Sequence, residues 1–233
     1  MVSFRMKWLF KYRLLFLCAV GLTLACTRMQ AQWMGPTFQE FNKKARGAVE
    51  VTNTGDIPNL VFCKAEGFDV DEHGTIQRHS LDPALHVRFA AERVELPPKG
   101  SRQISFDAIP ATVPAWFVVT CTFSPVVPQS GVKINMAIYS VVIVYGGPLD
   151  PRDVAVSAKH VGAKVEVEVK NNGPGLARVS SGEVLGHKKQ ANIGTFILFP
   201  HQRRLVEADW KETAMPETVR IQIGKKRLEA PVN

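Results

Sequence analysis

The stretch that decides the fold runs Gly131-Val-Lys-Ile-Asn-Met-Ala-Ile-Tyr-Ser-Val-Val-Ile-Val-Tyr145. It predicts one strand longer than the roughly three to ten residues usual in globular proteins. In its first half, bulky apolar side chains alternate with smaller or polar ones, at Val132, Ile134, Met136 and Ile138, so one face is apolar. From Val141 to Tyr145 every residue is apolar or aromatic, which is typical of a strand covered on both faces. We expect the first half to offer its apolar face to a partner, although an edge strand that packs this face on its own domain fits the same pattern.

Two pairs of similar segments indicate that the chain repeats one fold. Val49-Glu-Val-Thr-Asn-Thr-Gly55 is echoed by Val167-Glu-Val-Lys-Asn-Asn-Gly173. Further along, the strand and proline-containing turn of residues 94–106 are echoed by residues 197–206. The two similar segments occur in the same order in both halves of the chain, which indicates tandem copies of one fold. Short predicted strands alternate with Gly, Pro, Asn and Asp turns throughout, so we predict an all-β protein of two tandem sandwiches. The segment Pro148-Leu-Asp-Pro151 is the natural linker, which gives domains at 32–148 and 149–233.

The first 31 residues predict a secretory signal peptide. Four basic residues (Arg5, Lys7, Lys11 and Arg13) precede the apolar run from Leu14 to Ala25, which is too short to span a bilayer comfortably. Two cleavage points compete: cleavage after Ala31, and cleavage after Ala25, which fits the small-x-small rule better because Met29 stands at the third position before the other site. The second would leave Cys26 at the new terminus, but lipid anchoring there is less favoured because Thr23-Leu24-Ala25 is a poor lipobox. We therefore expect an exported protein with no transmembrane segment after signal cleavage.

Charge and chemistry motifs exclude several function classes. Because the leader holds five basic residues and no acidic ones, the formal net charge falls from +8 to +3 without it. The remaining basic residues are scattered and lack interleaved aromatics, which argues against nucleic-acid binding. The six histidines form neither a metal-ligand pair nor a nucleophile motif. We therefore expect no enzyme activity, no metal and no cofactor.

Two further motifs have competing interpretations. Asp69-Val-Asp-Glu-His-Gly74 is superficially like a calcium loop but lacks the closing Glu, so a solvated hairpin tip with its turn at Gly74 is favoured. Cys63 and Cys121 both sit in apolar, strand-like runs. A disulfide suits an exported protein, and two buried free thiols fit the sequence equally well because the Cα separation is not readable from it.

These residues together resemble the PapD-like periplasmic pilus chaperones. The resemblance rests on the 47–58 segment, on Leu96-Pro-Pro-Lys-Gly100, on the long strand before Gly146-Gly-Pro148, and on the second-domain marks at 167–173 and Phe199-Pro200. It implies two immunoglobulin-like domains and a periplasmic location. It also implies a protein client, a pilus subunit or similar that lacks its final strand, and an outer-membrane usher as a further partner. The long strand would be donated to the client, and its alternating residues Val132, Ile134, Met136 and Ile138 would fill the client's open groove.

One departure from the family pattern bears on this expectation. The family anchors a client's terminal carboxylate with an Arg near the first strand and a Lys late in the long strand. Here the Lys position falls on Val142 or Ile143, and Trp33 to Phe41 contains no Arg. The rival hypothesis is therefore a structural or adhesive exported protein that uses tandem immunoglobulin-like domains as spacers and packs the long strand internally. A small-ligand or glycan module is less favoured because Trp33, Trp116 and Trp210 are far apart in sequence.

Overall fold

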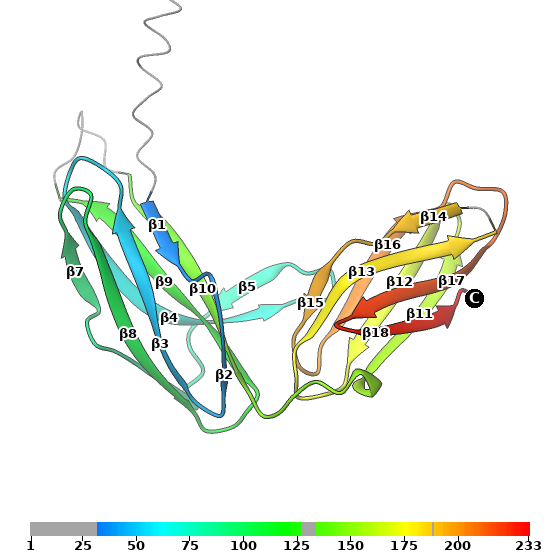
Figure 1. Ribbon diagram of the computed structural model, residues 1–233, viewed down its shortest axis with the longest axis horizontal. Coiled ribbons are helices and arrows are strands. Elements are labelled where there is room, and N and C mark those ends of the chain that lie inside the picture. Colours follow the sequence, from blue (N-terminus) through cyan, green and yellow to red (C-terminus); the bar gives the residue numbers. More distant parts are fainter. Residues whose placement is uncertain (1–31, 127–133, 188) are drawn as a thin grey trace, which may run out of the picture.

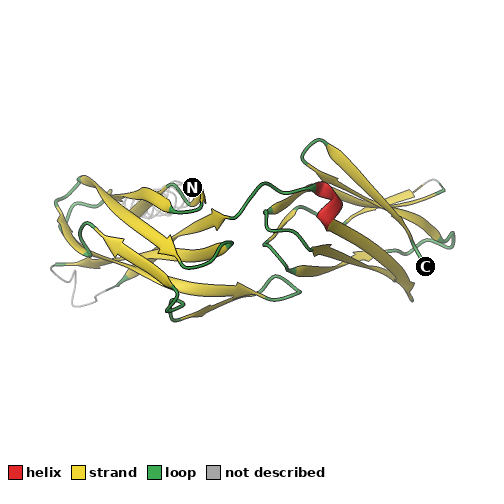
Figure 2. Ribbon diagram, turned by 90° about the horizontal axis from the view of Figure 1, so that it is seen from below, coloured by secondary structure: helices red, strands yellow, loops and turns green. Residues whose placement is uncertain are grey.

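A computed structural model describes residues 32–126, 134–187 and 189–233. The expected signal peptide and Val132 lie outside these residues. Figure 1 shows two groups of strands joined by a short linker, and the predicted fold class of two tandem β-sandwiches is confirmed. The linker leads into a short 3-10 helix, η2 (Pro151–Asp153), which Figure 2 shows in red where the chain enters the second sandwich. Within the described residues, no helix is long and apolar enough to cross a membrane.

The first sandwich contains two facing sheets. One is a four-stranded sheet in the order β1 (Gln32–Gly35), β3 (Ala45–Asn53), β8 (Ser101–Pro110) and β6 (Leu85–Phe89). The other has the order β2 (Phe38–Asn42), β10 (Met136–Tyr145), β9 (Ala115–Pro125), β4 (Asn59–Val70) and β5 (Ile76–His79), and β7 (Arg93–Leu96) also pairs with β4.

The second sandwich is built in the same way from shorter sheets. A three-stranded sheet has the order β11 (Val154–Val161), β12 (Lys164–Asn171) and β16 (Arg203–Asp209). It faces β14 (Lys189–Asn192), β13 (Ala177–Gly186), β17 (Pro216–Ile223) and β18 (Lys226–Pro231), and β15 (Phe196–Leu198) pairs with β13. Alternation explains why these strands form a core: in β12, Val165, Val167 and Val169 are buried while the residues between them are not, as expected of side chains that alternate across a sheet.

The two echoes in the sequence correspond to one buried asparagine in each sandwich. Asn53 donates its side-chain amide to the carbonyls of Ile57 (2.8 Å), Leu96 (3.3 Å) and Pro97 (3.0 Å), and its carboxamide oxygen accepts the Gly55 N–H at 3.0 Å. Asn171 makes the same bonds in the second sandwich. Its side-chain amide donates to the carbonyls of Gly175, Leu198 and Phe199, and its carboxamide oxygen accepts the Gly173 N–H. Each asparagine therefore joins the two echoed segments of its sandwich and satisfies backbone groups that burial would otherwise leave unpaired.

The sandwiches contact each other through an apolar cluster. Phe68, Val118 and Ile143 of the first sandwich pack against Leu176 and Phe199 of the second. The Phe199 ring meets the Phe68 ring edge-on, with centroids 5.4 Å apart, a favourable geometry for aromatic pairs.

The β4–β5 hairpin adds a polar connection between the two sandwiches and reaches toward the second one in Figure 1. Gly74 supplies the turn with a φ of +86°, so the predicted hairpin is confirmed. The tip is solvated only in part: His73 and Thr75 are exposed, but the Glu72 carbonyl accepts the N–H of Leu205 in β16 at 2.7 Å and the Glu72 side chain pairs with Arg203.

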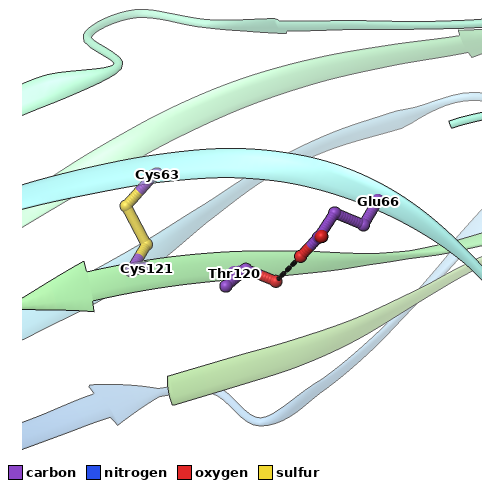
Figure 3. The surroundings of a disulfide bond; sticks show 4 residues. All are labelled: Cys63, Glu66, Thr120 and Cys121. Carbon is purple, nitrogen blue, oxygen red and sulfur yellow. Dashed lines mark hydrogen bonds between the residues drawn. A yellow bond between two sulfur atoms is a disulfide. The ribbon is translucent and has the colours of Figure 1, made fainter. Parts of the chain in front are cut away.

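A disulfide joins the middle of two neighbouring strands. Cys63 of β4 and Cys121 of β9 lie directly opposite each other in the sheet, with their Cα atoms 4.1 Å apart. Their sulfur atoms form a disulfide bond (Figure 3). Both residues lie within the core of the first sandwich.

The strand expected over residues 131–145 is shorter than predicted. It begins at Met136, and Ile134 and Asn135 are not in a strand. Met136 pairs with Phe123 of β9, so continuing the same register would place Ile134 opposite Pro125. Proline has no N–H to donate to the ladder, which accounts for the later start.

Candidate functional site

Strand β10 has a free edge along its first half. It pairs with β9 from Met136 to Val144, but it pairs with β2 only from Val141 to Tyr145. Among the described residues, Met136–Ser140 therefore has no strand partner on the side that β2 later occupies. An unpaired row of backbone N–H and C=O groups is a template for adding another strand.

The direction of the free backbone groups follows from β2. The Val141 N–H donates to the Thr37 carbonyl at 2.9 Å, on the β2 side. Because backbone groups alternate in direction along a strand, Tyr139 and Ala137 point their N–H and C=O groups to the same side, where β2 is absent. A strand added there would find these two residues ready to exchange hydrogen bonds.

The chain reaches this arrangement by changing sheets near its start. β1 pairs with β3 in one sheet, and after the cis Gly35–Pro36 peptide bond the chain enters β2 beside β10 in the other sheet. Ser140 fixes the point of entry, because its buried hydroxyl donates to the Pro36 carbonyl at 2.7 Å. Coverage of β10 therefore begins immediately after the free half.

Apolar side chains accompany the free edge. Ile134 is 72% exposed and Met136 is 39% exposed. Ile138 is partly buried and contacts the core of the first sandwich, to which Val142 and Val144 of the same strand belong. Met136 and Ile138 therefore continue the inward-facing side of β10 to a place where the sandwich no longer covers it fully. The fourth residue of the predicted set, Val132, lies outside the described residues.

The opposite face of β10 is polar and charged near the same edge. Tyr139 is paired with Thr120 of β9, which is paired with Lys64 of β4. The Thr120 hydroxyl donates to the Glu66 carboxylate at 2.6 Å (Figure 3), and Lys64 pairs with Glu66 at 2.9 Å. Partial burial raises the pKa of Glu66, but these hydrogen bonds and the charges of Lys64 and Arg78 outweigh it, and the net pKa is lowered. Glu66 is therefore a carboxylate at neutral pH.

The positions where the resemblance implies a basic anchor are apolar and enclosed. Val142 and Ile143 are fully buried, and Ile143 belongs to the cluster between the two sandwiches. Neither side chain offers a donor to a carboxylate. In the part of the chain that the structure describes, no group of three or more His, Cys, Asp or Glu residues is placed to hold a metal ion.

The chain is similar in fold to solved structures of chaperones. No family model matches the chain, and no curated protein sequence matches it. Among solved structures, the chain is similar to the YadV chaperone, with 13% identity, coverage of 85% of this chain and 98% of that chain, and a TM-score of 0.59. It is also similar to the class 5 fimbriae chaperone CfaA, with 13% identity, coverage of 87% and 99%, and a TM-score of 0.59.

A third similar structure contains a bound subunit. It is the Salmonella enterica SafA pilin in complex with the SafB chaperone, with 15% identity, coverage of 88% of this chain and 98% of that chain, and a TM-score of 0.55. At these identities the comparisons establish that the chain has the two-domain fold of the fimbrial chaperones. The resemblance inferred from the sequence motifs is confirmed at the level of the fold.

Proposed function

We propose that this protein is a periplasmic assembly chaperone that captures an incomplete β-sandwich client by pairing a client strand with the free edge of β10. The observation that carries the proposal is the unpaired backbone edge of Met136–Ser140 together with the exposed apolar side chains of Ile134 and Met136 at its start. Backbone hydrogen bonds would supply the pairing, and Ile134, Met136 and Ile138 would enter pockets of the client. The fold shared with proteins named as fimbrial chaperones supports the same function.

The magnitudes favour reversible capture. Fully burying an Ile or Met side chain contributes about 1.5–3 kcal/mol, so burying the fractions of Ile134 and Met136 that are now exposed contributes about 2–3 kcal/mol in total. Association costs about 4–15 kcal/mol. The backbone ladder and further client contacts must therefore supply the difference, which is consistent with a chaperone that later releases its client.

The rival hypothesis of a spacer protein requires the apolar face of β10 to be packed internally. Exposure of Ile134 and Met136 is unfavourable for a protein that never covers them, because large apolar side chains on a strand edge promote aggregation. This observation favours the chaperone over the spacer.

The remaining parts of the proposal follow the fold and the leader. Residues 1–31 would direct export and be removed, 32–148 would form the client-binding domain, and 149–233 would form the second immunoglobulin-like domain. The client would be a pilus subunit or a similar incomplete sandwich, and an outer-membrane usher would receive the complex. Val132 belongs to the predicted client-binding set by its place in the alternation.

The test is purification of the exported protein with identification of any stoichiometric partner. Met136→Asp is expected to abolish recovery of an incomplete-sandwich partner and to leave the thermal transition unchanged. Ile109→Asp is the matched control, because Ile109 is 61% exposed on β8, away from the free edge, and should retain the partner. Partner recovery with Met136→Asp, repeated isolation of the bare protein, or unfolding of this variant would each contradict the proposal.

A further inference from the structure

Arg78 reaches across the face of the sheet to the strand with the free edge. It lies in β5, which the sheet order separates from β10 by β4 and β9. Its guanidinium carbon nevertheless lies 3.9 Å from the centroid of the Tyr139 ring. This contact holds a long, exposed side chain against an aromatic surface, which reduces the entropy lost when the guanidinium binds a ligand.

The guanidinium of Arg78 has its donors available. Within the described part of the chain, Arg78 takes part in no ion pair within 4.0 Å, and its side chain makes no hydrogen bond. The neighbouring carboxylate, Glu66, is already engaged by Thr120 and Lys64. The two positive charges of Lys64 and Arg78 exceed the single negative charge of Glu66, so these three side chains together carry a net positive charge. Stacking on a ring leaves the edge N–H groups of a guanidinium free to bind a planar carboxylate with two hydrogen bonds.

The position of Tyr139 links this group to the free edge. Tyr139 points its backbone to the unpaired side of β10, and its side chain, 36% exposed, lies on the face that carries Thr120 and Lys64. A strand added to this edge would place one of its own side chains beside Tyr139 on the same face. Directly opposed residues in a sheet have Cβ atoms about 4.5–5.5 Å apart, which brings that side chain within reach of the guanidinium.

We infer that Arg78, held on the Tyr139 ring, binds a carboxylate carried by the strand that pairs with β10. This inference rests on the proposed function. It adds the requirement that the client strand carry a carboxylate as well as accept the apolar side chains of β10. The carboxylate comes either from an Asp or Glu side chain beside Tyr139 or from the α-carboxylate of a client strand that ends there. Both sources present the same planar anion to the guanidinium.

Synthetic peptide arrays test the inference without a known client. In one array, peptides with Val or Ile at alternate positions have amidated C-termini and carry Glu or Gln scanned through the intervening positions. In a second array, peptides without Glu or Asp differ only in having a free or an amidated C-terminus. Hydrogen bonds to charged groups contribute about 1.5–3 kcal/mol when formed. At 1.4 kcal/mol per tenfold change, we therefore expect the wild-type protein to prefer one carboxylate form over its neutral counterpart by about 10–140-fold.

Three variants make the test specific. Arg78→Ala should abolish the carboxylate preference and keep the apolar one, and Arg78→Lys, which keeps the charge but loses the planar fork, should retain a reduced preference. Arg93→Ala is the control, because Arg93 also lies over an aromatic ring, that of Phe62 at 5.6 Å, but on a strand that does not touch β10. It should bind as the wild type does, and thermal unfolding should show all three variants folded.

The two proposals fail in different ways. Equal binding of charged and neutral peptides by the wild type, or an unchanged preference in Arg78→Ala, would overturn the carboxylate site and leave strand capture standing. Failure of the wild type to bind any alternating peptide would overturn strand capture, and the carboxylate site with it.

Discussion

Replacing Asn171 by alanine should strongly destabilise the second sandwich, because its side chain serves several buried backbone groups. The amide donates to the carbonyls of Gly175 (2.7 Å), Leu198 (3.4 Å) and Phe199 (3.1 Å), and the oxygen accepts the Gly173 N–H at 3.1 Å. Leaving a buried polar group without a partner costs about 1–3 kcal/mol. If two or three of these groups stay unpaired, the free energy of unfolding falls by about 2–9 kcal/mol, a large share of the 5–15 kcal/mol usual for a protein.

Urea unfolding followed by tryptophan fluorescence measures this loss. Trp33 and Trp116 of the first sandwich also emit, so all variants are made in a background with both replaced by Phe. In that background Trp210, which is 3% exposed in the core of the second sandwich, reports that sandwich alone. Asn192→Ala is the matched control. Asn192 is exposed, and among the described residues its oxygen accepts a hydrogen bond from the Gly194 N–H alone, so its replacement should cost less than about 1 kcal/mol. Asn53→Ala should lower the stability of the first sandwich and leave the Trp210 transition nearly unchanged.

A small effect would refute the reasoning. If Asn171→Ala loses no more stability than Asn192→Ala, the backbone groups around it find other partners, and the asparagine is not what joins the echoed segments.

Three further predictions concern the disulfide, the linker and the contact between sandwiches. Replacing Cys63 and Cys121 by alanine should lower the free energy of unfolding by about 4 kcal/mol, the loop-closure entropy for a separation of 58 residues, and an equal urea midpoint would contradict it. The pKa of Asp150 is lowered from 3.8 to about 2 by its hydrogen bonds to Arg152. Its contribution to stability is therefore present above pH 4 and lost as the pH falls to 2, so the difference in melting temperature between wild type and Asp150→Asn should vanish over that range. Phe199→Ala should cost about 3 kcal/mol and widen the protein in small-angle scattering, whereas an unchanged scattering profile would show that the cluster does not hold the sandwiches together.

The tandem fold was predictable because the repeated segments carry a local physical requirement. An alternating strand that ends in Asn and Gly is visible in the sequence, and so is the second echo that follows it. What the sequence leaves unstated is that Asn53 and Asn171 make each pair of echoes a single hydrogen-bonded unit. That connection depends on the distance between segments more than 20 residues apart, which no local pattern encodes.

The apolar half of the candidate site could be read from the sequence, whereas the group proposed as its polar half could not. Alternation singled out Ile134, Met136 and Ile138, but the start of the strand was placed too early because Pro125 limits the ladder only through the register with β9. The contact between Arg78 and Tyr139 crosses two intervening strands, and a lone Arg in a short polar strand gives no signal of it. The sequence does not decide between a disulfide and free thiols at Cys63 and Cys121 for the same reason, since only the pairing of β4 with β9 brings the two residues together.

The entry of β2 beside β10 also limits the length of a guest strand. From Val141 onward the backbone of β10 is already occupied by the protein's own N-terminal segment, and Ser140 bonds to Pro36 at the junction. The vacant run Met136–Ser140 is about 17 Å long at roughly 3.3 Å per residue. If a client strand pairs here as proposed, a segment that extends past Ser140 must turn away from the sheet at Pro36. Few backbone hydrogen bonds then hold it to β10, and a competing strand has few to replace.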